Sequence, residues 1–126
     1  MLKKIMRYTF ETNPTVFGKI LRGEIPCRKV YEDDHVLAFH DIHPLAPIHV
    51  LIIPKTHIVG MQETTPADAE ILGKLMATVN TIATQLGVAA SGYRLITSAG
   101  AGGGQDVFHL HIHLLADPSG KPLPKL

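Results

Sequence analysis

The sequence has little cysteine, almost no excess of charge and no long hydrophobic run. Its one cysteine, Cys27, has no partner for a disulfide within the chain, which fits a reducing compartment, and we expect a cytoplasmic protein. The net charge of +1 argues against nucleic acid or an anionic membrane surface as a partner. No apolar stretch approaches the roughly 20 residues of a membrane-spanning helix. The basic start Met1–Arg7 is followed by polar residues, so we expect no secretory signal.

What is present is the composition of an ordinary folded domain. The 126 residues are 45% hydrophobic and 18% charged, which is enough to bury one core. We divide the chain into an N-terminal extension at residues 1–13, expected to be flexible, a domain at 14–116 and a C-terminal tail at 117–126. The tail contains three prolines and is expected to run over the surface.

The spacing of apolar residues predicts two helices and five strands. A first helix begins at Pro14, with Asn13 as a candidate N-cap, and stops before Gly23. A longer helix is expected over 65–86, and strands over 28–32, 36–40, 49–54, 93–98 and 108–116. Short turns between the strands, with one long helix packed across them, predict an α+β fold with an antiparallel sheet.

Three histidines alternate with aliphatic residues near the end of the chain: His109, His111 and His113. In an extended strand successive side chains point to opposite faces, so the imidazoles share one face while their aliphatic neighbours face a core. Histidine can act as nucleophile, proton donor or metal ligand near neutral pH, so this face predicts a chemical site. Zinc is the rival interpretation, with His49 or Asp106 as further ligands, but no cysteine or nearby glutamate completes a familiar ligand set.

A glycine-rich segment, Gly100–Gly104, precedes the alternating histidines. Glycine lets the backbone approach a ligand closely, so successive N–H groups can cradle a phosphate. Taken alone, such a segment is better explained as a flexible connection between antiparallel strands. Its position directly before the histidines favours a phosphate site.

The pattern His109-x-His111-x-His113, followed by two leucines, resembles the signature of the histidine-triad family. Other segments are similar to the Hint branch of that family, the purine nucleotide-binding phosphoramidases. These segments are Glu32–Asp34, Leu37–Ile42, Ala46-Pro47, His49, Ile52–Lys55, His57, Gly92–Arg94 and Gly103–Gln105. The resemblance extends over residues 15–116 and omits both ends of the chain.

The resemblance implies a reaction. His111 attacks the α-phosphorus of an adenosine phosphoramidate and forms a covalent nucleotidyl-histidine, from which water releases AMP. Such covalent catalysis divides one difficult displacement into two easier ones. His113 and His109, with His49, are implied to orient the nucleophile and to donate hydrogen bonds to phosphate oxygens. The resemblance implies no metal and no cofactor.

The resemblance also implies how the nucleotide is bound. The carboxylate of Asp41 accepts hydrogen bonds from both ribose hydroxyls, and the phosphate contacts Gly104, Gln105 and Asp106. Apolar side chains form the slot for the base: Val16, Phe17, Ile20, Phe39 and Ile42.

Two positions depart from the pattern of relatives. Asp106 stands where many eukaryotic members carry serine, and Ser98 where relatives often carry an asparagine that contacts the nucleotide. A carboxylate beside a phosphate is repulsive unless it is protonated or turned away. We therefore expect Asp106 to face solvent, with a general acid for an amine leaving group as the alternative. Ser98 can still donate one hydrogen bond to the nucleotide, with shorter reach.

The fold that the resemblance implies is a five-stranded antiparallel sheet with two main helices. A homodimer is also implied, in which the long helix and the fourth strand pair with their mates to make a ten-stranded sheet. Three other functions are weighed. Dinucleoside polyphosphate hydrolysis fits the Glu32–Asp34 and Asp41–Ala46 segments less well, and a transferase of the galactose-phosphate type usually has no histidine at the third triad position. A nucleotide-binding adaptor with weak turnover is left open by Asp106 and Ser98.

Overall fold

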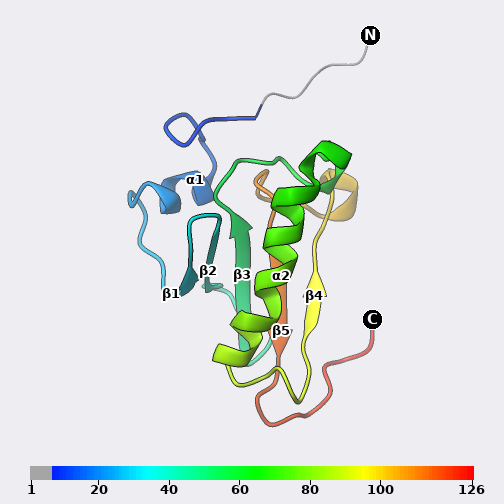
Figure 1. Ribbon diagram of the computed structural model, residues 1–126. Helices are drawn as coiled ribbons and strands as arrows, with labels where there is room; N and C mark the ends of the chain where they lie inside the picture. The colour runs from blue at the N-terminus through cyan, green and yellow to red at the C-terminus, as the bar shows by residue number, and fades with distance from the viewer. Residues whose placement is uncertain (1–6) are drawn as a thin grey trace.

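The fold is built around a single sheet, seen in the computed structural model, which describes residues 7–126 (Figure 1). In chain order the elements are α1 (Val16–Leu21), β1 (Lys29–Glu32), β2 (Val36–His40), β3 (Ile48–Pro54), α2 (Ala69–Gln85), β4 (Arg94–Ile96) and β5 (Ile112–Ala116). Short 3₁₀ turns lie at Met61–Glu63, Pro66–Asp68 and Ala101–Gly103. The expected α+β fold with a five-stranded antiparallel sheet is confirmed.

The strand order is β1-β2-β3-β5-β4, and every neighbouring pair is antiparallel. The pairing of β3 with β5 places Leu51 opposite His113 and His49 opposite Leu115. Because side chains two residues apart on a strand share a face, His49 and His113 are diagonal neighbours on the same side of the sheet. Residues 64 positions apart in the chain are thereby brought together.

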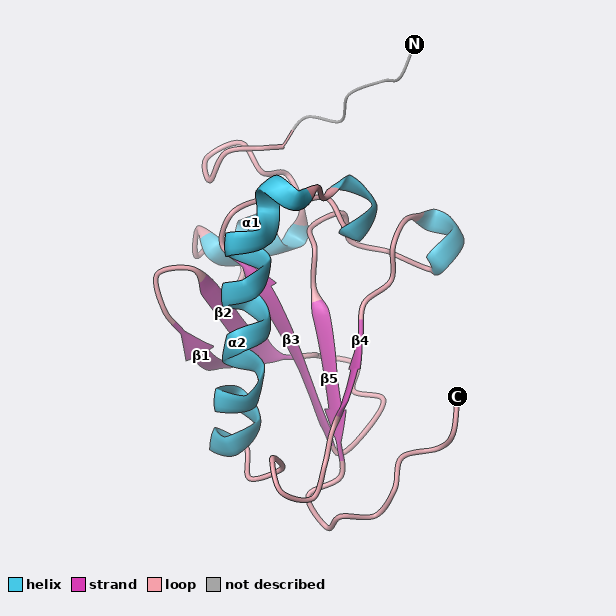
Figure 2. Ribbon diagram, turned by 45° about the vertical axis from the view of Figure 1, so that its right-hand side comes forward, coloured by secondary structure: helices cyan, strands magenta, loops and turns pink. Residues whose placement is uncertain are grey.

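The two faces of the sheet are covered differently (Figure 2). The helix α2 packs across one face over the larger core, which includes Val50, Ile52 and Leu114. The shorter α1 lies against the other face, where Phe17 joins the second cluster with Phe39 and Leu51 in it. Since both faces of β3 are covered, its sequence is a continuous apolar run instead of an alternating one.

The segment that carries the first two triad histidines is not part of a strand. The expected strand over 108–116 begins only at Ile112, because the preceding main chain makes other contacts. The N–H of Leu110 donates to the main-chain oxygen of Ile58, and the side chain of His111 bonds to the main chain of His109. The segment is nevertheless extended enough to keep the alternation, with Leu110 in the α2 core and His109 and His111 near Phe17.

The helix boundaries also differ from expectation at one end. The N-cap of α1 is Thr15, whose hydroxyl accepts from the N–H of Gly18, and the helix begins at Val16 instead of Pro14. The side chain of Asn13, the candidate cap, accepts from the N–H and hydroxyl of Thr15 and thus supports the true cap. The long helix, expected over 65–86, begins only at Ala69, because Pro66–Asp68 form a separate 3₁₀ turn capped by Thr65. The strand expected over 93–98 is shorter, Arg94–Ile96.

The C-terminal tail runs over the outside of the domain (Figure 1). Residues 7–13 of the N-terminal extension contact the domain through Arg7, Tyr8 and Asn13, while residues 1–6 lie outside the described residues. Within the described part of the chain, none of the helices has the length and apolar character needed to cross a bilayer.

Candidate active site

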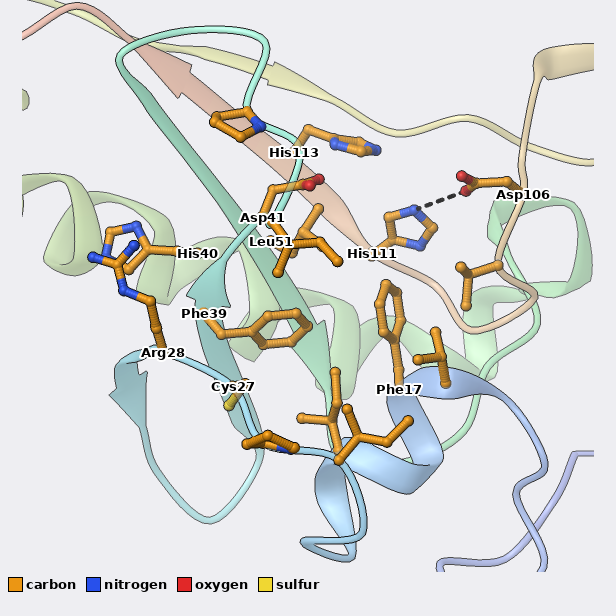
Figure 3. A pocket seen from close by; sticks show the side chains of 17 residues that line it. Phe17, Cys27, Arg28, Phe39, His40, Asp41, Leu51, Asp106, His111 and His113 are labelled. Atoms are coloured by element: carbon orange, nitrogen blue, oxygen red, sulfur yellow. Dashed lines mark ion pairs between the residues drawn. The ribbon is translucent and has the colours of Figure 1, made fainter.

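A cavity of about 710 Å³ opens on the α1 face of the sheet (Figure 3). Its floor and one wall are apolar side chains from α1, β2 and β3, and its other end is polar. Among its lining are most of the residues expected at the site: Val16, Phe17, Ile20, Phe39, Asp41, Ile42, Asp106, His111 and His113. The sheet therefore brings an apolar slot, two carboxylates and two of the triad imidazoles into one cavity.

The ring of His111 lies in the cavity with one nitrogen free. Its Nδ1 is 2.8 Å from the main-chain oxygen of His109, and because a carbonyl can only accept, Nδ1 carries the hydrogen. In the neutral ring this assignment leaves the lone pair on Nε2. Nε2 lies 4.0 Å from Oδ1 of Asp106, at the open side of the cavity (Figure 3). The arrangement presents an unprotonated ring nitrogen to a ligand.

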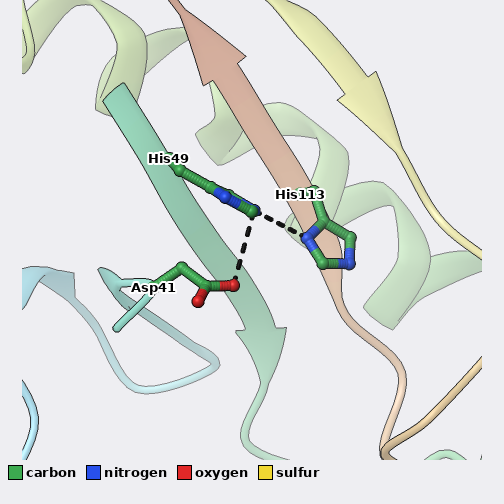
Figure 4. Close-up of side chains that lie close together, drawn as sticks. All are labelled: Asp41, His49 and His113. Atoms are coloured by element: carbon green, nitrogen blue, oxygen red, sulfur yellow. Dashed lines mark hydrogen bonds and ion pairs between the residues drawn. The ribbon is translucent and has the colours of Figure 1, made fainter. Parts of the chain in front are cut away.

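A chain of hydrogen bonds sets the opposite tautomer at His113 (Figure 4). The N–H of Leu45 donates to Nδ1 of His49 over 3.0 Å, so the hydrogen of His49 is on Nε2. That Nε2–H donates to Nδ1 of His113 over 2.8 Å, which places the hydrogen of His113 on its own Nε2. Oδ2 of Asp41 lies 3.4 Å from Nε2 of His49. A lone pair at His111 thus lies beside a donor at His113.

Burial keeps these two supporting rings neutral. The pKa of His113 is lowered by burial and by the neighbouring His111 and His49, and the pKa of His49 is lowered by burial against the opposing effect of Asp41. A neutral His49 can accept at one nitrogen and donate at the other. The chain from Leu45 to His113 needs this form of the ring, so it is preserved at neutral pH.

His109 is buried behind the cavity and does not line it. Its Nε2–H donates to the main-chain oxygen of Pro54 over 2.8 Å, and its Nδ1 accepts from the amide of Asn13 over 3.0 Å. Burial lowers its pKa to about 4. Both nitrogens are occupied by protein groups, so the contact of His109 with a phosphate, which the resemblance implies, is not available in this arrangement.

The glycine-rich segment is closed by Gln105. The amide of that side chain donates to the main-chain oxygens of Val59 and Val107, and its main-chain N–H donates to Gly100. The N–H of Gly104, where φ is +86°, also bonds within the segment. These donors are already used, so Gly104 and Gln105 shape the loop instead of offering hydrogen bonds to a phosphate.

The two acidic side chains of the cavity have different surroundings. Oδ1 of Asp41 accepts from the N–H of His43 over 2.8 Å, which fixes the carboxylate at the mouth of the apolar slot. Next to it, the side chain of Ile42 is 85% exposed. The side chain of Asp106 is 86% exposed, and it lines the cavity with its Oδ1 4.0 Å from Nε2 of His111.

Comparison with known proteins agrees with this geometry. The HIT domain family matches residues 22–119. The chain belongs to the histidine-triad (HIT) family. It is 46% identical to the purine nucleoside phosphoramidase of Escherichia coli K12, over 86% of this chain and 89% of that protein. It is 51% identical to an uncharacterized HIT-like protein of Synechococcus elongatus, over 83% of this chain and 91% of that protein. Among solved structures, a HIT family hydrolase from Clostridium thermocellum has a TM-score of 0.83 at 47% identity, covering 90% of this chain and 96% of that one.

Some lining residues of this HIT domain were missed by sequence reasoning. They are Ile25, Pro26, Cys27, Arg28, His40, Pro44, Leu51 and Val107. Leu51 could have been found, because it shares a strand face with His49. The segment Ile25–Arg28 carries no chemical pattern, and it reaches the cavity only because α1 ends just before it. Thr97 was also missed, although its hydroxyl donates to the main-chain oxygen of His111 over 2.8 Å. Ser98 lies next to Gly103 and does not line the cavity.

One group of side chains in this HIT domain has the spacing of metal ligands. The donor atoms of Asp41, His49 and His113 all lie within 4.8 Å of one another. The hydrogen bond between the two rings accounts for their approach, since two nitrogen ligands of a tetrahedral zinc ion, each about 2.0–2.1 Å from the metal, lie further apart than 2.8 Å. A zinc ion bound here would replace that hydrogen bond. It would occupy Nδ1 of His113, the nitrogen that accepts the bond from His49.

Proposed function

We propose that the protein is a nucleotide-binding hydrolase that cleaves purine nucleoside 5′-phosphoramidates, with adenosine preferred, through a nucleotidyl intermediate on His111. The observation that carries the proposal is the pair of opposite tautomers at the end of an apolar slot. Nε2 of His111 offers a lone pair, and Nε2–H of His113 offers a hydrogen bond. The related E. coli protein, named a purine nucleoside phosphoramidase, supports the same substrate class.

The chemistry follows from these two nitrogens. The lone pair of His111 attacks phosphorus, the P–N bond breaks, and the amine leaves with the bonding electrons and a proton taken from solvent at the open rim. His113 donates to a phosphate oxygen where negative charge develops, an effect typically worth about 3–4 kcal/mol for a preorganised donor. Water then attacks phosphorus, and the ring of His111 leaves. Imidazole suits both steps because it is nucleophilic when neutral and a good leaving group when protonated.

The remaining phosphate contacts are proposed on the main chain of Asp106 and Val107. Within residues 7–126, their N–H groups donate to no protein acceptor, unlike those of Gly104 and Gln105. Asp106 and Val107 both line the cavity beside His111. These two amides therefore replace the contacts that the resemblance implies for Gly104 and Gln105.

The function is tested by single-turnover assay with adenosine phosphoramidate and with a diadenosine polyphosphate, each after exhaustive chelation. We expect rapid release of AMP from the phosphoramidate in the absence of metal, because the nucleophile is an imidazole. Faster cleavage of the polyphosphate would favour the dinucleoside polyphosphate hydrolase, and tight binding without turnover would favour the adaptor. Activity that is lost on chelation and returns with stoichiometric zinc would identify a metal hydrolase.

Replacing Asp41 with alanine is expected to weaken AMP binding and to reduce the discrimination between AMP and dAMP. We propose that the free lone pairs of this carboxylate accept from both ribose hydroxyls, and a hydrogen bond to a charged group is worth about 1.5–3 kcal/mol. Calorimetry with both nucleotides measures the effect. Equal losses for AMP and dAMP would mean that Asp41 supports its loop, through the N–H of His43, and does not contact the ribose.

Replacing Asp106 with serine is expected to raise phosphoramidase turnover modestly or to leave it unchanged. The exposed carboxylate lies 4.0 Å from Nε2 of His111 and would repel an incoming phosphate. If Asp106 instead acts as general acid, the variant should lose about 10²–10⁴-fold in rate. That loss should be largest for poor amine leaving groups, so a series of amines of graded basicity separates the two outcomes.

The homodimer is also part of the proposal. The strand β4 is at the edge of the sheet, and its three residues are only partly buried. The exposed face of α2 includes Met76, which is 52% exposed. A second copy pairing along this edge would cover both features and give the ten-stranded sheet.

A further inference from the structure

Residues 7–13, here called the N-terminal arm, are attached to the domain by hydrogen bonds at both ends of the arm. At the start of the arm, the guanidinium of Arg7 bonds both carboxylate oxygens of Asp68 over 2.8 and 2.9 Å and also donates to the main-chain oxygen of Glu63. The pKa of Asp68 is lowered to about 2, chiefly by this hydrogen bond from Arg7. This ion pair fixes the arm to the turn before α2.

The next contact of the arm is with His57, a buried residue in one of the segments that resemble the Hint branch. The N–H of Tyr8 donates to Nδ1 of His57 over 2.9 Å, so the hydrogen of this ring lies on Nε2. That Nε2–H donates to the main-chain oxygen of Phe108 over 2.9 Å. The ring of His57 therefore connects the arm to the main chain of Phe108, the residue just before His109.

The end of the arm makes a second contact with the same stretch of chain. The side chain of Asn13 is 2% exposed, and its amide donates to Nδ1 of His109 over 3.0 Å. The oxygen of that amide accepts from Thr15, so the orientation of the amide group is set by the helix cap. His109 in turn provides the main-chain oxygen to which Nδ1–H of His111 donates. The arm thus lies two hydrogen bonds from the nucleophile.

Asn13 packs directly against Gly18, and this close contact requires a residue without a side chain. A Cβ added at Gly18 would lie 2.5 Å from Cγ and from the main-chain oxygen of Asn13, which is closer than real Cβ contacts. The guanidinium of Arg22 holds the same segment from outside by donating to the main-chain oxygens of Phe10 and Asn13. Gly18 in the first turn of α1 and Arg22 at its end therefore both keep Asn13 in contact with His109.

We propose that the N-terminal arm is part of the catalytic apparatus, with Asn13 and His57 as positioning residues that hold residues 108–109 and, through them, the tautomer and place of His111. The proposal rests on the function proposed above. Neither Asn13 nor His57 lines the nucleotide cavity. Loss of their contacts should therefore lower kcat and leave KM for the nucleotide substrate nearly unchanged, because the slot and the ribose site are intact.

Two substitutions at Asn13 separate a positioning role from a merely structural one. Asn13→Ala leaves Nδ1 of His109 buried without a donor. Asn13→Asp keeps the acceptor for Thr15 but places a carboxylate oxygen against Nδ1, and this contact is favourable only when His109 carries hydrogens on both nitrogens. The titratable side chains that face His109 are His57 and His111, and the guanidinium of Arg22 donates to the carbonyl of Asn13.

The kinetic experiment compares wild type, Asn13→Ala, Asn13→Asp, Arg7→Ala and the matched control Glu11→Ala, all as full chains. Glu11 is an exposed residue of the arm that makes no hydrogen bond within the described part of the chain. Both Asn13 variants should lose on the order of 10- to 100-fold in kcat, since small misplacement of a reacting group costs up to about 10²-fold. Arg7→Ala should lose less, and Glu11→Ala nothing. Equal kcat in all five proteins, each shown to be folded, would overturn the proposal.

A second measurement does not depend on activity. Imidazole ¹⁵N–¹H correlation spectra report which ring nitrogen carries hydrogen. In the wild type, His57 and His109 should be Nε2–H tautomers, and His111 an Nδ1–H tautomer. In Asn13→Asp at neutral pH, His109 should carry both hydrogens, and the tautomer of His111 should become mixed. Wild-type spectra with these tautomers and no phosphoramidase activity would contradict the proposed function alone. If the protein is active but the Asn13 variants keep the wild-type kcat and the wild-type His111 spectrum, only the positioning role of the arm is contradicted.

Discussion

Replacing His111 with alanine is expected to abolish phosphoramidase turnover and to leave nucleotide binding largely intact. The ring supplies the unprotonated Nε2 that attacks phosphorus, and neither of the other two triad imidazoles offers a free lone pair there. His109 is bonded at both nitrogens, and His113 presents a hydrogen at Nε2. Removal of a covalent nucleophile should cost several orders of magnitude in kcat. AMP binding, measured by calorimetry, should change little because the apolar slot and Asp41 remain.

The site of the covalent intermediate can be identified directly. Wild-type protein is mixed with substrate labelled at the α-phosphorus, quenched within a single turnover, and digested for peptide mapping. The label should be found on His111, and His111→Ala should trap none. His35→Ala is a matched control, because that exposed histidine lies far from the cavity, beside Lys74. Label recovered on His109 or His113 would contradict the assignment of the nucleophile.

Much of the fold could be predicted from the sequence because its signals are local. The continuous apolar run in β3 indicates a strand covered on both faces, and the stripe of apolar residues in α2 indicates one helix over a sheet. The alternation of histidine and aliphatic residues predicts which face each side chain takes. That prediction holds even where the segment at 109–111 is not a regular strand, since extended backbone alternates whether or not it is paired.

The candidate site was less fully predictable because the residues that support the triad come from parts of the chain far away in sequence. Asn13 bonds a residue 96 positions away, and His57 bonds residues 49 and 51 positions away. No local pattern marks such partners. Gln105 shows the opposite case, in which a motif marks the residue but not its role. Its amide is satisfied within the loop, so the proposed phosphate contacts keep Asp106 and gain Val107 in place of Gly104 and Gln105.

The tautomer of each triad ring is likewise a property of the fold and not of the motif. Identical residues in the pattern take different protonation patterns because each meets a different partner. His111 donates from Nδ1 to a main-chain oxygen, whereas His113 accepts at Nδ1 from His49. One ring becomes a nucleophile and its neighbour a donor. This division of roles depends on the register of β3 against β5, which brings His49 to His113.

Replacing His49 with alanine is therefore expected to have the second largest effect, a fall in kcat of about 10²–10³-fold, the usual cost of one preorganised donor. Without His49, the ring of His113 is free to carry its hydrogen on Nδ1, and the donor that faces the phosphate is lost. His49→Gln should recover part of the rate, because its amide can donate to Nδ1 of His113. His43→Ala, an exposed histidine in the loop between β2 and β3, is the matched control.

The measurement that decides this prediction is kcat and KM for all three variants together with the imidazole spectrum of His113. The pKa of both His49 and His113 is lowered in the folded protein, so the relay should stay neutral and intact as the pH falls below the ordinary pKa of histidine, about 6.5. Loss of rate in His49→Ala should accompany a shift of His113 from the Nε2–H to the Nδ1–H tautomer. If His49→Ala keeps wild-type kcat, or if His113 keeps its tautomer without His49, then hydrogen bonding through Leu45 and His49 does not orient the donor.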